Sequence, residues 1–338
     1  MTLWLFFAVV VLLISFALTW VLRRYALARS LMDIPNARSS HSIPTPRGGG
    51  VAIVIAFLLA TLVAQVAGLI EVSGGWALLG AGGGVAILGF LDDHGHIAAR
   101  WRLLGHFCAA LWALYWLGGL PPVVLFGRIL DLGWFGHFVA AFYLVWMLNL
   151  YNFMDGIDGI ASVEAVTVCL GGCLLYGLSG YATHALLPLL LAMAVLGFLI
   201  WNFPPARIFM GDAGSGFLGV VLAILSLQAA SVSAQWLWSW IILLGVFVVD
   251  ATFTLIRRLV RGDKVYEAHR SHAYQYASRQ FGKHLPVTLA VLLVNLLWLM
   301  PIALLVGIWG LDGALGVILA YAPLVVLAMK YKAGALER

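Results

Sequence analysis

Charged side chains are scarce in this chain, at 10% of 338 residues, whereas hydrophobic residues reach 63%. Together with a mean hydropathy of +1.03, this composition excludes an ordinary water-soluble globular domain. A chain of this kind must satisfy its backbone hydrogen bonds inside lipid, and long helices do so within one segment. We therefore predict an all-α polytopic membrane protein.

Three other signals are missing. The three cysteines, Cys108, Cys169 and Cys173, lie in apolar runs without the spacing of a zinc site, so we interpret them as apolar packing residues. No glycine cluster is followed by Gly-Lys-Ser/Thr, which excludes a P-loop. The first apolar run is not preceded by basic residues, and Arg23-Arg24 follow it, which favours a retained membrane anchor over a cleaved signal peptide.

Eleven apolar runs have about the length needed to cross ~30 Å of hydrocarbon. They cover residues 3–22, 49–70, 76–91, 103–119, 134–150, 160–178, 185–201, 216–230, 236–256, 286–306 and 314–329. The polar stretches between them are too short to bury a core, so residues 1–338 are expected to form one integral membrane domain. Its cytoplasmic loops are expected at about residues 23–48, 92–102, 151–159, 202–215 and 257–285.

The basic residues determine the predicted orientation. If the N-terminus is outside, Arg128 is the only one of 19 Lys and Arg residues that falls in an external segment. Because cytoplasmic loops carry the excess of Lys and Arg, we expect the N-terminus outside and the C-terminus inside. The polar groups at the ends of the apolar runs then lie on the cytoplasmic face, where we expect the functional site.

Three groups of acidic and amide residues stand where apolar runs end. They are Asp92 and Asp93; Asn149, Asn152, Asp155 and Asp158; and Asp212. Charges near lipid are costly, so the presence of all three groups at one predicted face needs a reason. Oxygen ligands and adjacent aspartates that repel each other favour a divalent cation, Mg²⁺ with Mn²⁺ as the alternative, beside a phosphate. Each group also has a plainer interpretation as a helix cap or a solvated loop.

Two predicted cytoplasmic loops combine histidine with arginine. One carries His269-Arg270-Ser271-His272, and the other carries Arg38, His41 and Arg47. Because arginine can bind a phosphate through two hydrogen bonds, both loops could hold the phosphate of a substrate. The alternatives are a juxtamembrane loop that attracts anionic lipids for the first and a linker for the second.

In this order the motifs resemble those of the polyprenyl-phosphate N-acetylhexosamine-1-phosphate transferases, glycosyltransferase family 4 in its wider usage. The resemblance runs from about residue 30 to 285 and rests on five elements: Pro-Thr-Pro-Arg-Gly-Gly-Gly, Asp-Asp, Asn-x-x-Asn-x-x-Asp-Gly-x-Asp-Gly, Phe-Met-Gly-Asp-x-Gly-Ser and a histidine-containing loop. It implies Mg²⁺-dependent transfer of a sugar 1-phosphate from a UDP-N-acetylhexosamine to undecaprenyl phosphate, with release of UMP. It also implies a multi-pass enzyme of the bacterial inner membrane. Its expected partners are these substrates and the lipid bilayer, without nucleic acid and with a homodimer as one option.

The resemblance also gives the candidate residues their expected roles. The expected metal ligands are Asp212, Asp92 and Asp93. The expected catalytic residues are Asp92, Asp93, Asp158, His269, Arg270 and His272. The expected substrate-binding residues are Asn149, Asn152, Arg38, His41 and Arg47, and, toward the uridine, Asp155, Asn202 and Phe209. Direct attack by the lipid phosphate, with or without Asp92 as proton acceptor, and a covalent aspartyl-phosphate route both stay open.

Departures from the family pattern bear on the branch. Where the branch that transfers phospho-N-acetylmuramoyl-pentapeptide has three consecutive histidines, this chain has His269-Arg270-Ser271-His272, and His96 stands where that branch has a lysine. The loop is more similar to the branch that initiates O-antigen and related surface glycans, with UDP-GlcNAc, UDP-GalNAc, UDP-FucNAc and UDP-QuiNAc as open donors. The pentapeptide branch of peptidoglycan synthesis is the alternative. A membrane transporter is the rival from another class, and Asp250, inside an apolar run, favours it because transporter carboxylates usually lie near the midplane. We prefer the interpretation that Asp250 faces the functional site from about one to two turns below the membrane surface. A scaffold or lipid-binding protein without catalysis is a third option, which leaves the acidic groups unexplained.

Overall fold

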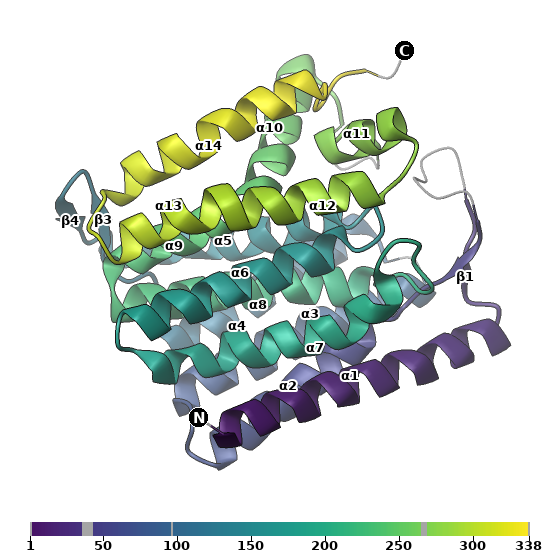
Figure 1. The fold of residues 1–338 in the computed structure, drawn as a ribbon. Helices are drawn as coiled ribbons and strands as arrows, with labels where there is room; N and C mark the ends of the chain where they lie inside the picture. Colours follow the sequence, from purple (N-terminus) through teal and green to yellow (C-terminus); the bar gives the residue numbers. More distant parts are fainter. Residues whose placement is uncertain (1, 36–42, 96, 265–268, 337–338) are drawn as a thin grey trace.

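The structure, a computed structural model, describes residues 2–35, 43–95, 97–264 and 269–336. It is a bundle of long helices that run side by side, with a short strand pair toward each end (Figure 1). The helices are α1 (Thr2–Ala28), α2 (Gly50–Val66), α3 (Val72–His94), α4 (Ala99–Leu117), α5 (Gly133–Met154), α6 (Ile160–Leu178), the 3₁₀ helix η1 (Ala182–Ala185), α7 (Leu186–Asn202), α8 (Asp212–Val232), α9 (Ala234–Leu243), α10 (Gly245–Arg261), α11 (Ala273–Phe281), α12 (Leu285–Val294), the π-helix η2 (Asn295–Leu299), α13 (Met300–Gly307) and α14 (Gly313–Lys330). The antiparallel strand pairs are β1 (Met32–Asp33) with β2 (Thr45–Pro46) and β3 (Val123–Leu125) with β4 (Arg128–Leu130).

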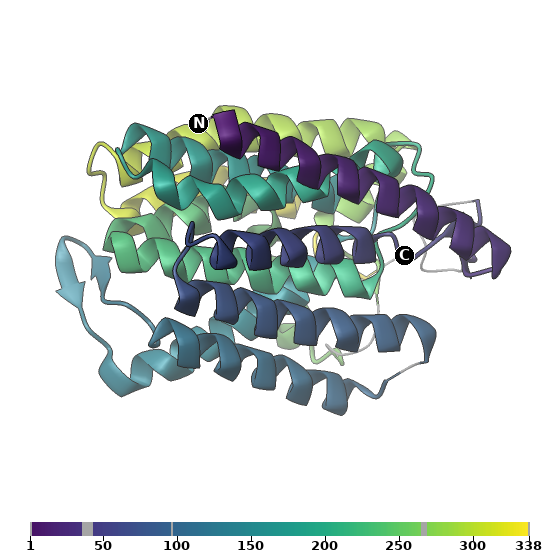
Figure 2. The same cartoon turned by 90° about the horizontal axis from the view of Figure 1, so that it is seen from below.

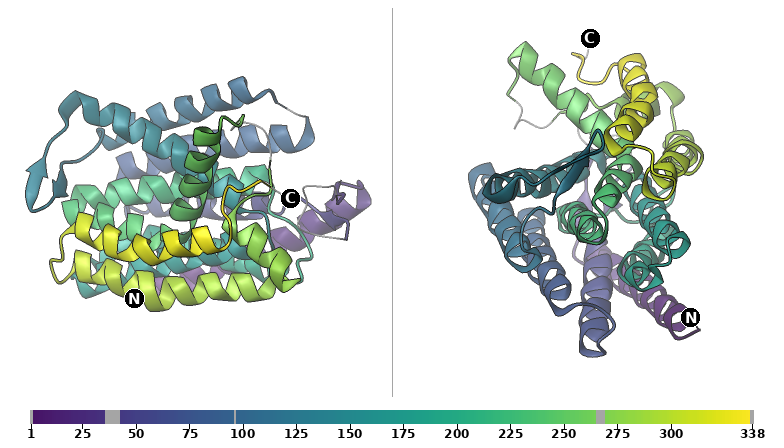
Figure 3. Two further views of the ribbon diagram at one scale, coloured as in Figure 1. Left: turned by 90° about the horizontal axis from the view of Figure 1, so that it is seen from above. Right: turned by 90° about the vertical axis from the view of Figure 1, so that its left-hand side faces the viewer.

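Helix α8 lies at the centre of the bundle and packs against α2, α3, α5 and α9. Every residue from Ala213 to Leu227 is buried, and the end-on view in Figure 3 (right) shows the other helices packed around this centre. Gly219 brings α8 against α5, because a Cβ there would lie 2.6 Å from the carbonyl oxygen of Met147. Small residues of this kind allow the close approach of helices in lipid. The centre of the bundle therefore carries the Gly211–Ser215 motif at the start of its most buried helix.

The helices support a polytopic membrane protein. Within the described residues, eight helical segments are long and apolar enough to cross a membrane, or nine if α9 and α10 count as one bent span. The predicted eleven are reached only when α2, with 17 residues, and α4 are added, so the number of spans and the orientation stay predictions. The chain starts at one end of the bundle and reaches the opposite end at its C-terminus (Figure 1). Figure 2 shows the β3–β4 pair projecting beyond the helices at the end of the bundle opposite to β1 and β2.

The apolar run at residues 236–256, predicted as one span, is bent in the structure. The chain breaks between α9 and α10, which meet at 74°. Gly245 opens α10, and a Cβ there would lie 2.9 Å from the ring of Tyr321. Beyond the break α10 carries Arg257, Arg258 and Arg261, which favour a path to water over a path through lipid. The break thereby turns α10 across the bundle, as the left panel of Figure 3 shows.

The loops are shorter than the sequence predicted, because helices continue into the polar motifs. Helix α3 runs to His94, α5 runs to Met154 and α8 already begins at Asp212. The expected loop at 257–285 contains the end of α10 and the whole of α11. The polar residues at these helix ends face one another across a shared site instead of facing bulk water. The helices can therefore continue through the polar motifs.

Candidate active site

The carboxylate groups meet in one cavity of about 230 Å³ at the ends of α3, α5 and α8. Segments far apart in the sequence contribute side chains to this first cavity: Asp33, Arg47, Asp93, Asn152, Asp155, Asp158, Asn202, Phe209, Asp212, Gln275 and His284. The structure thus brings together members of all three groups of acidic and amide residues that the sequence singled out, whereas Asp92 and Asn149 line a neighbouring cavity. Arg38, His41 and His96 lie outside the described residues.

The start of α8 rests directly on α3. A Cβ at Gly89 would lie 2.6 Å from the carbonyl carbon of Asp212, so this approach requires glycine. The backbone N–H of Ala213 points at Asp93 Oδ2 over 3.4 Å. Gly211 turns the chain into the helix with a φ of 78°, a left-handed conformation that glycine adopts without strain. This joint places the carboxylates of Asp93 and Asp212 on the same cavity.

Asp92 is already paired with a cation. Arg102 makes an ion pair with the Asp92 carboxylate, and its Nη1 also lies 3.8 Å from Asp212 Oδ2. The backbone N–H of Ile97 donates to Asp92 Oδ1 at 2.7 Å. Arg102 therefore supplies the positive charge beside Asp92 for which the sequence interpretation needed a metal ion. The metal role predicted for Asp92 is the weakest of the three, and it stays a prediction.

A second cavity, of about 390 Å³, adjoins the first, because Asn152 and Asp212 line both. Its other polar side chains come from α3, α4, α5 and the segment before α11: Asp92, Arg102, His106, Asn149, His269 and His272. Its remaining wall is apolar: Val85, Leu88, Leu103, Leu148 and Phe153. A cavity lined by both charged and apolar side chains suits an amphiphile with an anionic head.

The end of α5 separates the two cavities. Asn152 Oδ1 accepts a hydrogen bond from Ser215 Oγ at 3.1 Å, which ties α5 to α8.

Burial, followed by the carboxylates of Asp212, Asp93 and Asp158, raises the pKa of Asp155 well above its usual range. The carboxyl of Asp155 is thus buried at the wall of the first cavity, close to three other carboxylates.

The first cavity offers the oxygen donors that Mg²⁺ prefers, without a closed metal site. Among the residues that the structure describes, no three Asp, Glu, His or Cys side chains are placed to hold an ion by themselves. Mg²⁺ commonly takes one or two carboxylates and completes its shell with water and substrate phosphates. Asp93 and Asp212, with Asp155 beside them, fit such a partial shell.

Asn202 and Phe209 tie the wall of the first cavity together. Asn202 is 3% exposed; its Oδ1 accepts from the backbone N–H of Gly159, and its Nδ2 donates to the carbonyl of Ile208, both at 3.0 Å. The backbone N–H of Phe209 donates to the carbonyl of Pro46 at 2.8 Å. Asn202 thus positions two loops, and the predicted contacts of Asn202 and Phe209 with uridine stay predictions.

Asp158 has partners of its own on the same wall. Its Oδ2 accepts from the backbone N–H of Ala206 at 2.9 Å, and its Oδ1 lies 3.0 Å from His284 Nδ1. Thr288 Oγ1 donates to its carbonyl at 2.8 Å. These contacts describe a residue that holds α12 and the 203–206 segment on the cavity, and its predicted catalytic role stays a prediction.

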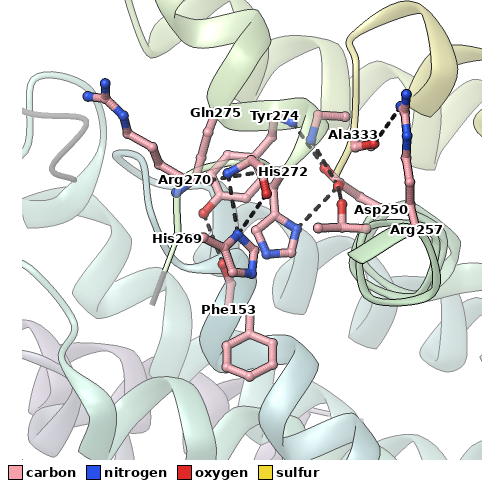
Figure 4. Close-up of polar contacts among 12 residues, drawn as sticks. Phe153, Asp250, Arg257, His269, Arg270, His272, Tyr274, Gln275 and Ala333 are labelled. Atoms are coloured by element: carbon pink, nitrogen blue, oxygen red, sulfur yellow. Dashed lines mark hydrogen bonds and ion pairs between the residues drawn. The ribbon is translucent and has the colours of Figure 1, made fainter. Parts of the chain in front are cut away.

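The histidine loop, residues 269–272, presents two stacked rings to the second cavity (Figure 4). The ring centroids of His269 and His272 are 4.9 Å apart. Burial, followed by the neighbouring His272 and Arg258, lowers the pKa of His269 to about 3, so its ring is neutral near pH 7. Arg270 extends away from the two rings in Figure 4, and within the described residues it lines neither cavity. The structure therefore separates Arg270 from the two histidines with which the sequence grouped it.

Asp250 holds the histidine loop in place. Its carboxylate accepts from the backbone N–H groups of Ala273 and Tyr274 at 2.9 and 3.0 Å. These N–H groups belong to the first turn of α11, where backbone donors lack partners within the helix. Tyr274 in turn donates from its hydroxyl to the carbonyl of Phe153 at 3.0 Å. The one residue that favoured a transporter is thus a buried cap of α11.

The sequence interpretation gave no role to several residues of the cavities, among them Arg102, Gln275 and His284. The position of Arg102 shortly after Asp92 and Asp93 was a usable signal, because a turn between two helices returns it to the aspartates. No local pattern marks Gln275 or His284, since both reach the site only through the packing of α11 and α12.

Comparison with known proteins agrees with this geometry. The family model of Glycosyl transferase family 4 matches residues 75–230. The chain is 32% identical over 276 residues, 79% of this chain and 75% of the relative, to a probable undecaprenyl-phosphate N-acetylglucosaminyl 1-phosphate transferase of Bacillus subtilis. It is 28% identical over 293 residues, 85% of this chain and 87% of the relative, to an undecaprenyl-phosphate alpha-N-acetylglucosaminyl 1-phosphate transferase of Thermotoga maritima. A phospho-N-acetylmuramoyl-pentapeptide-transferase of Moorella thermoacetica is 34% identical over 198 residues, 54% of this chain and 61% of the relative. This multi-pass membrane chain therefore belongs to the polyprenyl-phosphate N-acetylhexosamine-1-phosphate transferases of glycosyltransferase family 4.

Proposed function

We propose that the protein transfers an N-acetylhexosamine 1-phosphate from a UDP-sugar to undecaprenyl phosphate and releases UMP. The product would start a lipid-linked surface glycan of the O-antigen type at a bacterial cytoplasmic membrane. One observation supports this most: two cavities of different character share the wall formed by Asn152 and Asp212. The acidic cavity suits a nucleotide diphosphate that arrives with a divalent cation, and the other suits a lipid phosphate with its apolar chain.

The reacting phosphorus would lie at the shared wall. An oxygen of the lipid phosphate attacks the phosphorus that carries the sugar, the bond between this phosphorus and the UMP oxygen breaks, and UMP leaves. Both reactants are anions, so the site must offset their repulsion before they meet. Mg²⁺ bound beside Asp93 and Asp212 would supply positive charge at the pyrophosphate. Arg102, which faces both Asp92 and Asp212, adds a fixed positive charge at the same wall.

The histidine loop would act on the lipid side. His269 and His272 line the cavity with the apolar wall. Nδ1 of His269 accepts from the backbone N–H of Ser271 at 3.3 Å, so the neutral ring of His269 carries its proton on Nε2 and can donate a hydrogen bond to the attacking phosphate. A neutral ring donates without carrying a full charge into a partly apolar cavity, where an unpaired charge is costly. Preorganised donors of this kind stabilise charge that develops in the transition state.

Two observations favour the surface-glycan branch over the pentapeptide branch. The histidine loop lacks three consecutive histidines, and relatives that cover most of this chain are named for N-acetylglucosaminyl 1-phosphate transfer. UDP-GlcNAc is therefore the first donor to test. The similarity to the pentapeptide transferase covers 54% of this chain. UDP-N-acetylmuramoyl-pentapeptide is therefore the alternative donor to test.

A donor panel tests the proposal. Membranes that contain the protein receive undecaprenyl phosphate, Mg²⁺ and, in separate reactions, radiolabelled UDP-GlcNAc, UDP-GalNAc, UDP-FucNAc, UDP-QuiNAc or UDP-N-acetylmuramoyl-pentapeptide. We expect a lipid-linked product from one of the four sugars without a peptide. A product only from the pentapeptide donor would assign the chain to the other branch, and no lipid product from any donor would contradict the proposal.

A further inference from the structure

We propose that the tail segment, Ala333–Gly334, positions the histidine loop for the reaction. This inference rests on the proposed function, because the loop would serve the lipid phosphate. The tail segment follows α14, at the far end of the sequence from most of the site. It lies against the loop and α10, as Figure 4 shows for Ala333 and Arg257.

A backbone hydrogen bond connects the tail segment to the loop. The N–H of Gly334 donates to the carbonyl of Ser271 at 2.7 Å. Ser271 stands between His269 and His272, the two residues whose rings line the second cavity. Its carbonyl belongs to the peptide unit that leads into His272, so the hydrogen bond fixes the orientation of that unit. The tail segment thus acts on the rings through the backbone between them.

Two arginines of α10 hold the tail segment itself. Arg257 Nη1 donates to the carbonyl of Ala333 at 3.0 Å, and Arg261 Nη1 donates to the carbonyl of Gly334 at 2.7 Å. Ala333 is fully buried. Gly334 has a φ of 69°, and a Cβ there would lie 3.0 Å from the Arg257 Cβ. The tail segment is buried and held by two arginines, so specific contacts determine its position.

The loop is therefore held at two points. Asp250, on α10, binds the N–H groups that follow His272, and the tail segment binds the carbonyl that precedes it. Loss of the second anchor should leave α11 in place and let the rings of His269 and His272 rotate. Small misplacements of reacting groups can cost about 10²-fold in rate, so the second anchor should matter for turnover more than for donor binding.

Two truncations separate the tail segment from the residues after it. A chain that ends at Lys332 lacks the segment, whereas a chain that ends at Ala335 keeps Ala333, Gly334 and all their contacts. We expect the first truncation to lower kcat by about 10-fold or more, with little change in KM for the UDP-sugar, because the first cavity is untouched. The second truncation should retain the kcat of the full chain. Equal kcat values for the full chain and the chain ending at Lys332 would overturn the inference.

Hydrogen exchange gives a readout that does not depend on catalysis. Backbone amides of residues 269–276 should exchange faster in the chain ending at Lys332 than in the chain ending at Ala335. Amides of residues 149–160 should exchange alike in both. If the donor panel shows no transfer, the proposed function fails, but faster exchange in 269–276 would still support the positioning contact. Unchanged exchange there would refute the contact whatever the activity.

A point variant covers the case in which the shorter chain does not fold. Arg257→Ala removes the hydrogen bond to Ala333 and leaves the chain complete. We expect a smaller fall in kcat and a smaller rise in exchange than for the truncation, and Arg257→Lys should restore part of both. Arg24→Ala, an exposed arginine on α1, is the matched control. Identical behaviour of Arg257→Ala and Arg24→Ala would overturn the inference.

Discussion

Asp250 Oδ1 lies 3.3 Å from Nδ1 of His272, and the two side chains are 8% and 3% exposed. Nδ1–H can donate a hydrogen bond to the carboxylate, which leaves Nε2 to bind a ligand, as an acceptor in the neutral ring and as a donor in the protonated ring. The same carboxylate caps α11, so one buried residue of α10 determines both the position of the loop and the orientation of one of its rings. The break before α10 is what places Asp250 there.

Asp250→Ala should therefore weaken both the fold of this region and turnover. It leaves the N–H groups of Ala273 and Tyr274 without their acceptor, which costs about 1–3 kcal/mol for a buried group, and it releases the ring of His272. We expect a lower melting temperature in detergent and a lower kcat. Asp131→Ala is the control, because Asp131 also accepts a backbone N–H, that of Gly133, but lies next to β4, away from the site. Equal losses for the two variants would contradict the role of Asp250.

The residues of the histidine loop should differ in their effects. His269→Ala and His272→Ala remove rings that line the second cavity, and we expect each to lower kcat by ~10²-fold or more, as for the loss of a preorganised donor. Arg270→Ala should cost less, because its side chain points away from the rings. Steady-state rates in neutral detergent, with Arg24→Ala as control, measure the difference. A larger loss for Arg270→Ala than for the histidine variants would show that Arg270 is the main functional residue of the loop.

Two glycines of α3 provide a matched test of the joint with α8. Gly89→Ala puts a methyl group 2.6 Å from the backbone of Asp212, whereas Gly84→Ala meets nothing within 4 Å. Overpacking of this kind costs about 1–3 kcal/mol, and here it must also displace Asp212. We expect Gly89→Ala to lose most activity and Gly84→Ala to keep it, at similar expression in membranes. Full activity of Gly89→Ala would show that Asp212 need not lie against α3.

The depressed pKa of His269 predicts how stability changes with pH. In the unfolded chain a histidine titrates near 6.5, and in the folded chain this ring titrates at about 3. Between these two pH values the unfolded chain binds a proton on this histidine and the folded chain does not. The free energy of unfolding therefore falls as the pH is lowered from 7 toward 4. His269→Gln should reduce this fall, seen as a smaller drop in melting temperature between pH 7.5 and 5. An equal drop in the parent would contradict the burial of His269.

The sequence was sufficient for the parts of the site that lie at helix ends. Asp93, Asn152, Asp155 and Asp212 lie where apolar runs end or begin. Helices that pack side by side, in either chain direction, bring these ends to one face of the bundle. The five ordered motifs were sufficient to infer the family, and the long apolar runs were sufficient to infer the helical membrane fold. The signal was strong because a polar residue next to lipid needs a partner.

The contacts that depend on tertiary packing could not be predicted. The break at Leu244 leaves an apolar run uninterrupted in sequence, so the sequence does not predict the bend that brings Asp250 to α11. The pairing of Asp92 with Arg102, and the separation of Arg270 from its histidine neighbours, depend on side-chain directions that spacing does not give. The tail segment reaches the loop across more than 60 residues of sequence, between Ser271 and Gly334.

Transfer of a sugar 1-phosphate at the wall shared by the two cavities must release UMP, so the nucleotide product distinguishes this reaction from transfer of the sugar alone. Purified protein is incubated with undecaprenyl phosphate, Mg²⁺ and UDP-GlcNAc, or the donor selected by the panel, labelled in both sugar and uridine. We predict lipid-linked sugar and UMP in a one-to-one ratio, lost together on addition of EDTA and in Asp212→Asn. Release of UDP in place of UMP would contradict transfer of a sugar 1-phosphate, and full activity of Asp212→Asn would contradict a site at the wall that Asp212 forms.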